Sequence, residues 1–335
     1  TAAFAQRENK MNHLWITVAL LISFVVSETP SAMAQLGGGP RTLESGGPMQ
    51  VILLGTGIPI PNPKRATAAT MVIAGDKTIL VDTGRGCDVR LAEARLRAEN
   101  LTAVLFTHYH SDHIAGFGDL LMRRGAAGAE DPLPVIGPPG AKRVVDGFRT
   151  AYALDSSYRA AHHGEYWGTR GAEAAVTEAE PGVVFDQDGL QVTMFKVNHA
   201  PIDPAVGYRF DYQGKVVVVS GDTIKTEKMI EMSQDADVLV HEAMDLQALH
   251  RIIPLLQRTR PRQAALLKDV TEYHASTIDV AEIARDAGVK KLVLTHLVPS
   301  IPPEDAAEKN FVRGMSDIYD GPIIVGRDVM TIDVE

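Results

Sequence analysis

Residues 106–113 read FTHYHSDH and place four side chains of the types that bind metals within six positions: His108, His110, Asp112 and His113. The stretch before them, LTAVLFTH at residues 101–108, is apolar and rich in β-branched residues, which is typical of a buried strand. The cluster is therefore predicted to lie in the loop at the carboxyl end of that strand, a position that functional loops favour.

The spacing of the cluster predicts two directions for its side chains. Side chains two residues apart in an extended segment share a face, so His108 and His110 point the same way. Asp112 and His113 turn away at the start of a helix. Retaining four such polar groups for packing alone would be costly, since each one buried without a partner costs roughly 1–3 kcal/mol. We interpret the turn as a metal site that could serve two ions.

Three later strands end in further ligand-type residues. FKVNHAP leads into His199, VVVVSGDT into Asp222, and KLVLTHL into His296. Taken singly, each has a plainer interpretation as a helix cap, a turn aspartate or an edge histidine. Together they are expected at one edge of the sheets, where they would supply the ligands that the first cluster lacks.

The rest of the chain alternates strands with helices. Strands are predicted near residues 50–57, 190–197, 206–212, 215–220, 238–241, 291–294 and 323–325, and two more within residues 70–84 around a Gly-Asp turn. Helices are predicted near residues 87–98, 225–234 and 278–287. This alternation over two similar halves favours an α/β architecture of two sheets between helices.

The first 48 residues are predicted to lie outside the fold. Residues 1–34 resemble a signal peptide with a few upstream residues, because an apolar run at residues 14–26 follows two basic residues and precedes SAMA, a cleavage site near Ala34. Residues 35–48 form a linker rich in Gly and Pro, and residues 49–335 form the folded domain. The protein is therefore expected in the periplasm or outside the cell. The apolar run is too short for a stable membrane anchor, which needs about 20 residues.

The composition limits which partners the protein is expected to bind. The chain of 335 residues has a net charge of −9, and nucleic-acid backbones bind to clustered Lys and Arg. Nucleic acid is therefore predicted to be an improbable partner. The single cysteine, Cys87, allows no internal disulfide and is interpreted as a small packed hydrophobe.

The motifs THYHSDH, SGDT and LTHL, with His199 between them, resemble in this order the metallo-beta-lactamase superfamily over about residues 49–333. The resemblance implies a four-layer αββα sandwich of two mixed sheets. It also implies that one ion is held by His108, His110 and His199, the second by Asp112, His113 and His296, with Asp222 as the bridge. Asp82, in LVDTG, matches the aspartate that orients ligands in this superfamily, although a turn cap is an alternative role.

Further stretches narrow the resemblance to ribonuclease Z and its arylsulfatase-like relatives: GTGIPIPNPKRATAAT, VGYRFDYQGKVVVVSGDT, HEAM and EYHAST. This branch implies that Glu242 and His274 pass a proton to the leaving oxygen. Asp112, Glu242 and His274 are the predicted catalytic residues. His274 also precedes a capping-box pattern at residues 276–279, which gives it a purely structural alternative.

The function expected from these residues is an exported dinuclear hydrolase that uses a hydroxide between two metal ions, acting on small anionic phosphate or sulfate esters. Imidazole and carboxylate ligands without thiolate suit two Zn²⁺, and Mn or Fe also fits the ligand types. Lys64 and Arg65 could bind the anion or lie on a solvated loop. The alternatives are a lactonase or beta-lactamase, a ribonuclease Z-like nuclease, an iron-dependent redox protein, and a non-catalytic metal-binding protein. A homodimer is an open alternative to a monomer.

Overall fold

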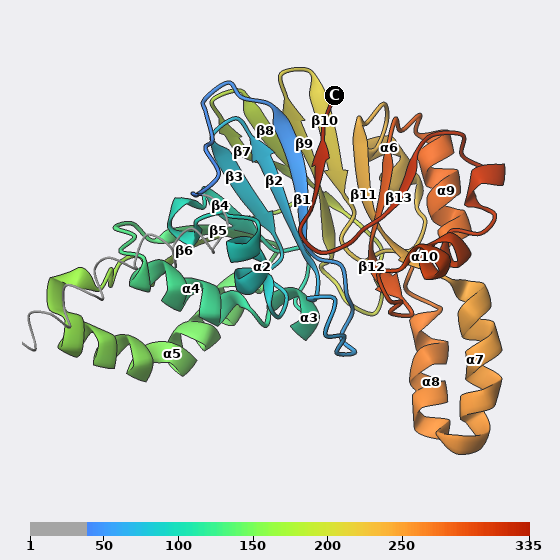
Figure 1. Ribbon diagram of the computed structural model, residues 1–335, viewed down its shortest axis with the longest axis horizontal. Helices are drawn as coiled ribbons and strands as arrows, with labels where there is room; N and C mark the ends of the chain where they lie inside the picture. The colour runs from blue at the N-terminus through green and yellow to red at the C-terminus, as the bar shows by residue number, and fades with distance from the viewer. Residues whose placement is uncertain (1–38) are drawn as a thin grey trace, which may run out of the picture. The chain divides into compact units, whose positions relative to one another are not determined.

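The computed structural model describes residues 39–335, and residues 42–335 form the unit whose fold follows (Figure 1). These residues hold two seven-stranded sheets. In the first sheet the strands lie in the order β14 (Met330–Asp333), β1 (Met49–Gly55), β2 (Ala69–Ala74), β3 (Lys77–Val81), β4 (Ala103–Leu105), β5 (Leu133–Gly137) and β6 (Ala174–Glu178).

The second sheet has the same number of strands and the same mixed character. Its order is β13 (Ile323–Val325), β12 (Leu292–Val298), β11 (Val238–Met244), β10 (Lys215–Val219), β9 (Val206–Tyr212), β8 (Leu190–Lys196) and β7 (Gly182–Gln187). Strands β10 to β13 run parallel, as do β3 to β6 in the first sheet, while the remaining neighbours are antiparallel. The carboxyl ends of the parallel strands therefore meet at one edge.

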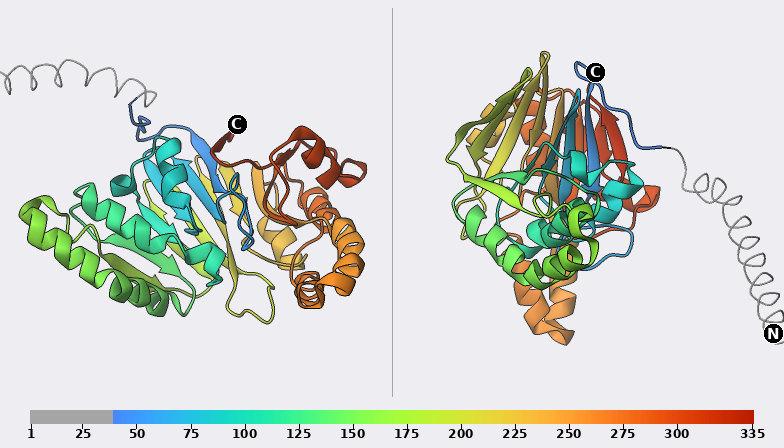
Figure 2. Two further views of the ribbon diagram at one scale, coloured as in Figure 1. Left: turned by 60° about the horizontal axis from the view of Figure 1, so that its bottom comes forward. Right: turned by 90° about the vertical axis from the view of Figure 1, so that its left-hand side faces the viewer.

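Helices cover the outer face of each sheet (Figures 1 and 2). Those beside the first sheet are α2 (Cys87–Glu93), α3 (Ser111–Ile114), α4 (Phe117–Ala126) and α5 (Ala141–His163). Those beside the second sheet are α6 (Glu227–Met232), α9 (Thr277–Asp286) and α10 (Asp305–Phe311), whereas α7 (Leu246–Thr259) and α8 (Pro261–Val270) extend past its strands.

Three apolar clusters separate these layers. One lies between the sheets and joins residues of both, such as Leu53 and Val217. A second packs α2 and α4 on the first sheet, and a third packs α6 and α9 on the second. This arrangement of helix, sheet, sheet and helix confirms the predicted four-layer α/β sandwich.

Several element boundaries differ from those expected from periodicity. The helix predicted over residues 87–98 ends at Glu93, and the strand predicted over residues 101–108 is confined to Ala103–Leu105. Strand β11 continues to Met244 and β12 to Val298, beyond the apolar runs that predicted them. Both strands are extended by residues that contribute to the site described below.

The helices α4, α5, α7, α8 and α10 were not predicted. Helix α5 spans Ala141–His163, although its only buried residues are Ala141 and Val145. A hairpin of two helices, α7 and α8, follows β11 and projects past the ends of the strands (Figures 1 and 2). A single turn at residues 259–261 joins the two helices.

The predicted signal peptide at residues 1–34 lies outside the residues that the structure describes. Within residues 39–335, no helix is long and apolar enough to cross a membrane. Cys87 is buried, as interpreted from the sequence.

Candidate dinuclear metal site

The site residues lie at the carboxyl ends of strands from both sheets. His108 and His110 follow β4, and Asp112 and His113 lie in the short helix α3 directly after them. His199 follows β8, Asp222 follows β10, and His296 lies near the end of β12. All seven predicted ligands are therefore brought together, at the edge where the two sheets meet.

The three histidines of the first predicted group converge on one point. His108 Nε2 lies 2.9 Å from His110 Nδ1, which in turn lies 3.4 Å from His199 Nε2. The ligand atoms of these three residues and of Asp222 all lie within 4.8 Å of one another. Nitrogen atoms with converging lone pairs need a shared cation or a shared proton between them.

The second group lies on the other side of the Asp222 carboxylate. Asp112, His113 and His296 also place their ligand atoms within 4.8 Å of one another, and all three are buried. Asp222 Oδ2 lies 3.3 Å from His113 Nε2 and 3.5 Å from His296 Nε2. It also lies 3.8 Å from the Nε2 atoms of His108 and His199, so one carboxylate oxygen faces both groups.

Hydrogen bonds on the outer side of the rings fix which nitrogen faces inward. His113 Nδ1 lies 2.7 Å from Asp82 Oδ2, and His199 Nδ1 lies 3.0 Å from the carbonyl oxygen of Tyr273. An Nδ1–H donated to either oxygen leaves Nε2 as the free lone pair, which is the usual way in which proteins orient imidazole ligands. His113 Nε2 is buried and faces the Asp222 carboxylate at 3.3 Å, as expected of an atom that binds a metal ion.

Asp82 is itself held by Thr107. Its two carboxylate oxygens accept hydrogen bonds from the Thr107 backbone amide, at 2.8 Å, and from the Thr107 hydroxyl, at 2.7 Å. The Thr107 hydroxyl also lies 3.1 Å from His108 Nδ1. Asp82 therefore orients ligands of the second group, and Thr107 links it to the first.

The charges of the cluster act on its ligands in different ways. Burial alone would lower the pKa of His113, but the carboxylates of Asp222, Asp82 and Asp112 raise it well above its usual value, so a divalent ion that binds there would displace a proton. Burial lowers the pKa of His108 well below its usual value, so its imidazole is neutral. Burial alone would raise the pKa of Asp222, but the neighbouring imidazoles of His296 and His113 lower it well below its usual range. Neutral imidazole and ionised carboxylate are the forms that bind divalent metals, so this donor set fits such ions.

A β-bulge directs His296 into the site. Glu242 of β11 pairs with Thr295 and the next residue, Ala243, pairs with Leu297, so His296 is the extra residue in β12. Its φ angle is +43°, in the left-handed region that non-glycine residues rarely adopt. Bulges re-aim side chains next to functional sites, and here the ligand lies on the bulge itself.

Gly221 permits the turn that presents Asp222. Its φ angle is +63°, and a Cβ atom placed there would lie 2.7 Å from the carbonyl oxygen of Val206 and 3.0 Å from Thr107. Only glycine fits this close approach between strand ends of the two sheets.

Glu242 and His274 form a buried pair beside the cluster. His274 Nδ1 lies 2.8 Å from Glu242 Oε1, which also accepts hydrogen bonds from the backbone amides of Thr223 and Ala275. Burial lowers the pKa of His274, but the Glu242 carboxylate raises it more, to about 9. The capping box at Ser276 and Asp279 is also present, so His274 lies beside both features.

A cavity of about 390 Å³ opens onto the cluster. Its polar wall includes His110, Asp112, Asp222, His274 and His296. The opposite wall is apolar and was not predicted; it comprises Ile58, Pro59, Ile60, Leu266, Leu267, Val270, Val298 and Pro299. Leu266, Leu267 and Val270 are spaced so that their side chains share one face of a helix. This apolar pattern was the signal in the sequence from which the wall could have been predicted.

Lys64 and Arg65 do not take part in this cavity. Arg65 is buried, and its guanidinium donates to the Thr56 hydroxyl and to the carbonyl oxygens of Gly326 and Ile301. Lys64 forms an exposed ion pair with Glu304. The suggestion that they bind an anion is therefore not supported, because Arg65 serves the fold.

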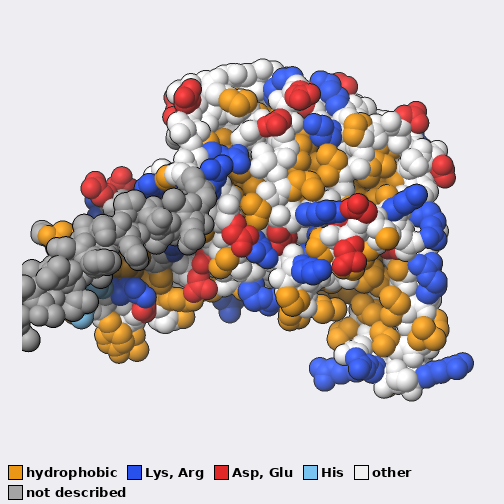
Figure 3. Space-filling view, viewed as in Figure 1, with side chains coloured by type: hydrophobic (Ala, Val, Ile, Leu, Met, Phe, Trp, Pro, Cys, Tyr) orange, Lys and Arg blue, Asp and Glu red, His pale blue; other side chains and the backbone are white. Residues whose placement is uncertain are grey.

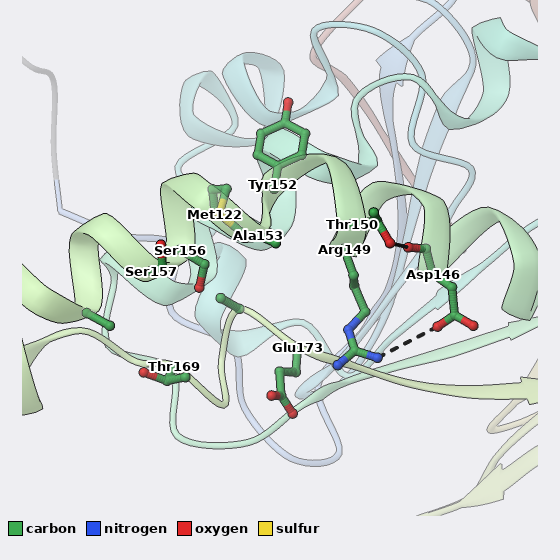
Figure 4. A pocket seen from close by; sticks show the side chains of 12 residues that line it. Met122, Asp146, Arg149, Thr150, Tyr152, Ala153, Ser156, Ser157, Thr169 and Glu173 are labelled. Atoms are coloured by element: carbon green, nitrogen blue, oxygen red, sulfur yellow. Dashed lines mark hydrogen bonds and ion pairs between the residues drawn. The ribbon is translucent and has the colours of Figure 1, made fainter.

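A second cavity, of about 590 Å³, lies between α5 and residues 169–173 (Figure 4). Arg149 reaches Asp146 there at 3.7 Å, and Glu173 lines the same space. Its lining contains no histidine or cysteine, so it lacks the donor set of the first cavity. Residues 151–170 are mostly the second half of α5, and Trp167 after it is buried.

The fold and the paired ligand groups define a metal-dependent hydrolase, and the comparisons with known proteins agree. Residues 77–297 match the family model described as a beta-lactamase superfamily domain. The metallo-beta-lactamase fold protein YhfI from Bacillus subtilis superposes with a TM-score of 0.62 at 20% identity, covering 86% of this chain and all of that one. The short form of human tRNase Z gives a TM-score of 0.61 at 21% identity, covering 85% of this chain and 99% of that one.

Curated relatives are more similar in sequence. Ribonuclease Z of Mycobacterium bovis (strain BCG / Pasteur 1173P2) is 37% identical over 289 residues, which cover 85% of this chain and 98% of the relative. Ribonuclease Z of Mycobacterium sp. (strain KMS) is 39% identical over 262 residues, which cover 78% of this chain and 88% of the relative. The chain belongs to the beta-lactamase superfamily and, within it, to the ribonuclease Z family. Divalent metal binding follows from this fold and from the histidine and aspartate cluster.

Two predictions from the sequence are wrong. The expected activity on small phosphate or sulfate esters conflicts with relatives that are named as ribonucleases over most of the chain. The prediction that nucleic acid is an improbable partner fails for the same reason. It relied on the net charge of −9, which sums the whole surface, whereas contact with phosphates depends on the local charge beside the site.

Proposed function

We propose that this protein is a ribonuclease that hydrolyses phosphodiester bonds in RNA, with tRNA-containing transcripts as the first substrate class to test. The observation that carries the proposal is the buried Glu242–His274 pair beside two convergent ligand groups, in one cavity. The ribonuclease Z relatives and the human tRNase Z structure support RNA as the substrate.

The donor set favours two zinc ions. His108, His110 and His199 would hold one, Asp112, His113 and His296 the other, with the Asp222 carboxylate shared between them. Imidazole and carboxylate ligands without thiolate suit Zn²⁺. When bound, a pair of divalent ions activates a water molecule and stabilises charge on the attacking and leaving oxygens of a phosphate.

The pair formed by Glu242 and His274 supplies the proton that the reaction needs. Cleavage of an RNA phosphodiester breaks a P–O bond and leaves a sugar oxygen as a poor leaving group. Because Glu242 engages His274 Nδ1, the Nε2 atom is left to donate its proton to that oxygen. The backbone amides of Thr223 and Ala275 hold the Glu242 carboxylate in place, which keeps the imidazole in one orientation.

The proposal is tested by offering the zinc-loaded protein a tRNA transcript with extra residues at its ends, a DNA strand of the same sequence, an aryl sulfate, a lactone and a beta-lactam. We expect cleavage of the transcript at defined positions and markedly slower turnover of the other four compounds. Efficient hydrolysis of the lactone or the sulfate, with no cleavage of the transcript, would show that the substrate class is different.

A further inference from the structure

The α7–α8 hairpin forms one wall of the cavity that contains the metal cluster. Leu266, Leu267 and Val270 of α8 line this cavity together with His110, Asp222 and His274. The base of the hairpin is fixed by an apolar cluster that includes Leu249 of α7 and Ile58 of the loop after β1. The other end of the hairpin projects away from the sheets (Figures 1 and 2).

The free end of the hairpin is basic. Residues 246–270 contain five basic side chains and one acidic side chain: Arg251, Arg258, Arg260, Arg262 and Lys268 against Asp269. Three of the arginines lie at the turn between the helices and are exposed. Lys and Arg side chains gather at this end of the molecule in the space-filling view (Figure 3).

These arginines are not neutralised by the fold. Within residues 39–335, no carboxylate lies within ion-pair distance of Arg258, Arg260 or Arg262, and the one hydrogen bond of the group joins Arg260 to Gln263 at 3.5 Å. Some other exposed arginines are paired, such as Arg97 with Glu99 and Arg285 with Asp286, and others are not; the three at the turn differ in lying together within five positions. A positive group left unpaired beside an active site is suited to an anionic partner.

The face of the hairpin between the turn and the cavity is apolar and exposed. Leu266 is 57% exposed and Leu255 is 68% exposed, and Ile60, which lines the same cavity as Leu266, is 59% exposed. Hydrophobic side chains cover this part of the hairpin above the basic end (Figure 3). Apolar surface followed by positive charge matches a nucleic acid strand, which presents flat bases and a line of phosphates.

We propose that the α7–α8 hairpin is the arm that holds the RNA substrate, with the basic turn on its phosphates and the apolar face of α8 against a base next to the cleaved bond. The inference rests on the proposed ribonuclease function and names the element that binds its substrate.

The length of α8 predicts the distance between the two contacts. From Val270, which lines the cavity, to Pro261 at the turn, its 10 residues span about 15 Å at 1.5 Å per residue. Successive phosphates of one duplex strand advance by about 3.4 Å along the helix axis, so the turn reaches phosphates about four nucleotides from the cleaved bond.

The test compares a triple variant, R258A/R260A/R262A, with a control triple variant, R97A/K228A/R285A, which removes the same charge from exposed residues that do not line the cavity. Both are assayed on a tRNA-containing transcript and on a nitrophenyl phosphodiester that is too short to reach the turn. For the turn variant we expect KM for RNA to rise by roughly tenfold. We also expect the slope of log affinity against log salt to become shallower by about 2, because each single-strand phosphate contact contributes about 0.7.

For the control variant we expect KM and salt slope within about twofold of the parent protein. An unchanged KM and salt slope in the turn variant would overturn the assignment of the hairpin, even though the parent protein cleaves RNA. Loss of turnover on the nitrophenyl phosphodiester by the turn variant would also overturn it, since that would show damage to the site itself. If the parent protein does not cleave RNA at all, the proposed function fails, which is a distinct result.

Discussion

At the scale of single residues, the site combines ligands whose positions follow from sequence with contacts that do not. The cluster from His108 to His113 is predictable because its members are adjacent and follow an apolar strand. The contact of His199 with the Tyr273 carbonyl oxygen joins residues 74 positions apart, so no local pattern reveals it. The bulge at His296 is also unpredictable, since its left-handed conformation depends on the pairing of β11 with β12.

His274 is predicted to act on the leaving oxygen. General acid catalysis contributes about 10²- to 10⁴-fold when the leaving group needs a proton, and a nitrophenolate needs none. The variant H274A should therefore lose about that factor in kcat on an RNA transcript and change little on a nitrophenyl phosphodiester, with bound metal unchanged. Equal losses on the two substrates would indicate that His274 only positions other groups.

Asp82 is predicted to hold a ligand rather than to bind metal. Its carboxylate fixes His113 through a 2.7 Å hydrogen bond, and loss of such a partner typically weakens metal binding by about 10- to 100-fold. We expect this loss in D82A, measured as zinc affinity by competition with a chelator. The variant D76A, which removes an exposed aspartate from the turn before β3, is the control. If D82A binds zinc with the same affinity as the parent protein, Asp82 acts only as a turn cap.

At the scale of secondary-structure elements, the strands were predicted better than the helices. Strands such as β9 and β10 are apolar runs between turn residues, which define them locally. Helix α5 has only two buried residues, so its sequence carries little amphipathic signal. The α7–α8 hairpin contains Pro254 and Pro261, which interrupt the helical pattern although the second lies at the start of α8.

An ionised aspartate, Asp237, stabilises the connection between β10 and β11. Asp237 accepts hydrogen bonds from the Val216 amide, at 2.7 Å, and from Lys290, at 2.8 Å. Burial alone would raise the pKa of Asp237, but these hydrogen bonds lower it below its usual value. The stability that the carboxylate contributes is therefore present above its unfolded pKa of about 3.9 and lost as the pH falls through the lower folded value.

We expect D237N to lower the free energy of unfolding at pH 7 by about 1.5–3 kcal/mol, the range for hydrogen bonds to charged groups. The difference from the parent protein should shrink as the pH falls below about 3.9 and through the lower folded pKa of Asp237, where both proteins carry a neutral side chain at this position. Urea unfolding at pH 7 and at a series of acidic pH values measures this difference. If the difference in the free energy of unfolding between D237N and the parent protein stays constant with pH, the charge of Asp237 does not stabilise the connection between β10 and β11.

At the scale of the whole molecule, the fold class and the ligand set follow from sequence, but the substrate does not. The ligands are fixed by chemistry at a few strand ends, whereas substrate choice depends on the surface around the cavity. Net charge was a poor guide because the acidic residues are spread over the molecule and the basic turn at residues 258–262 is concentrated on one hairpin. A sum over the chain cannot show this distribution.

The predicted signal peptide stays a prediction. If residues 1–34 direct export, the mature protein should begin near Gln35, because small residues at Ala32 and Ala34 favour cleavage after Ala34. Mass spectrometry of the protein produced in a bacterium and recovered by periplasmic extraction would give this N-terminus. A soluble cytoplasmic product that retains residues 14–26 would contradict export.

RNA cleavage during a metal titration tests the dinuclear ribonuclease most directly. The chelator-treated protein is mixed with a tRNA-containing transcript while zinc is added, and bound zinc per chain is measured alongside the cleavage rate. We predict no cleavage without zinc and full cleavage only as binding approaches two ions per chain, with D222A losing both tight binding and cleavage because Asp222 faces both ligand groups. The assignment as a dinuclear ribonuclease would be contradicted if the metal-free protein cleaved the transcript, or if the protein with two bound ions per chain did not cleave it.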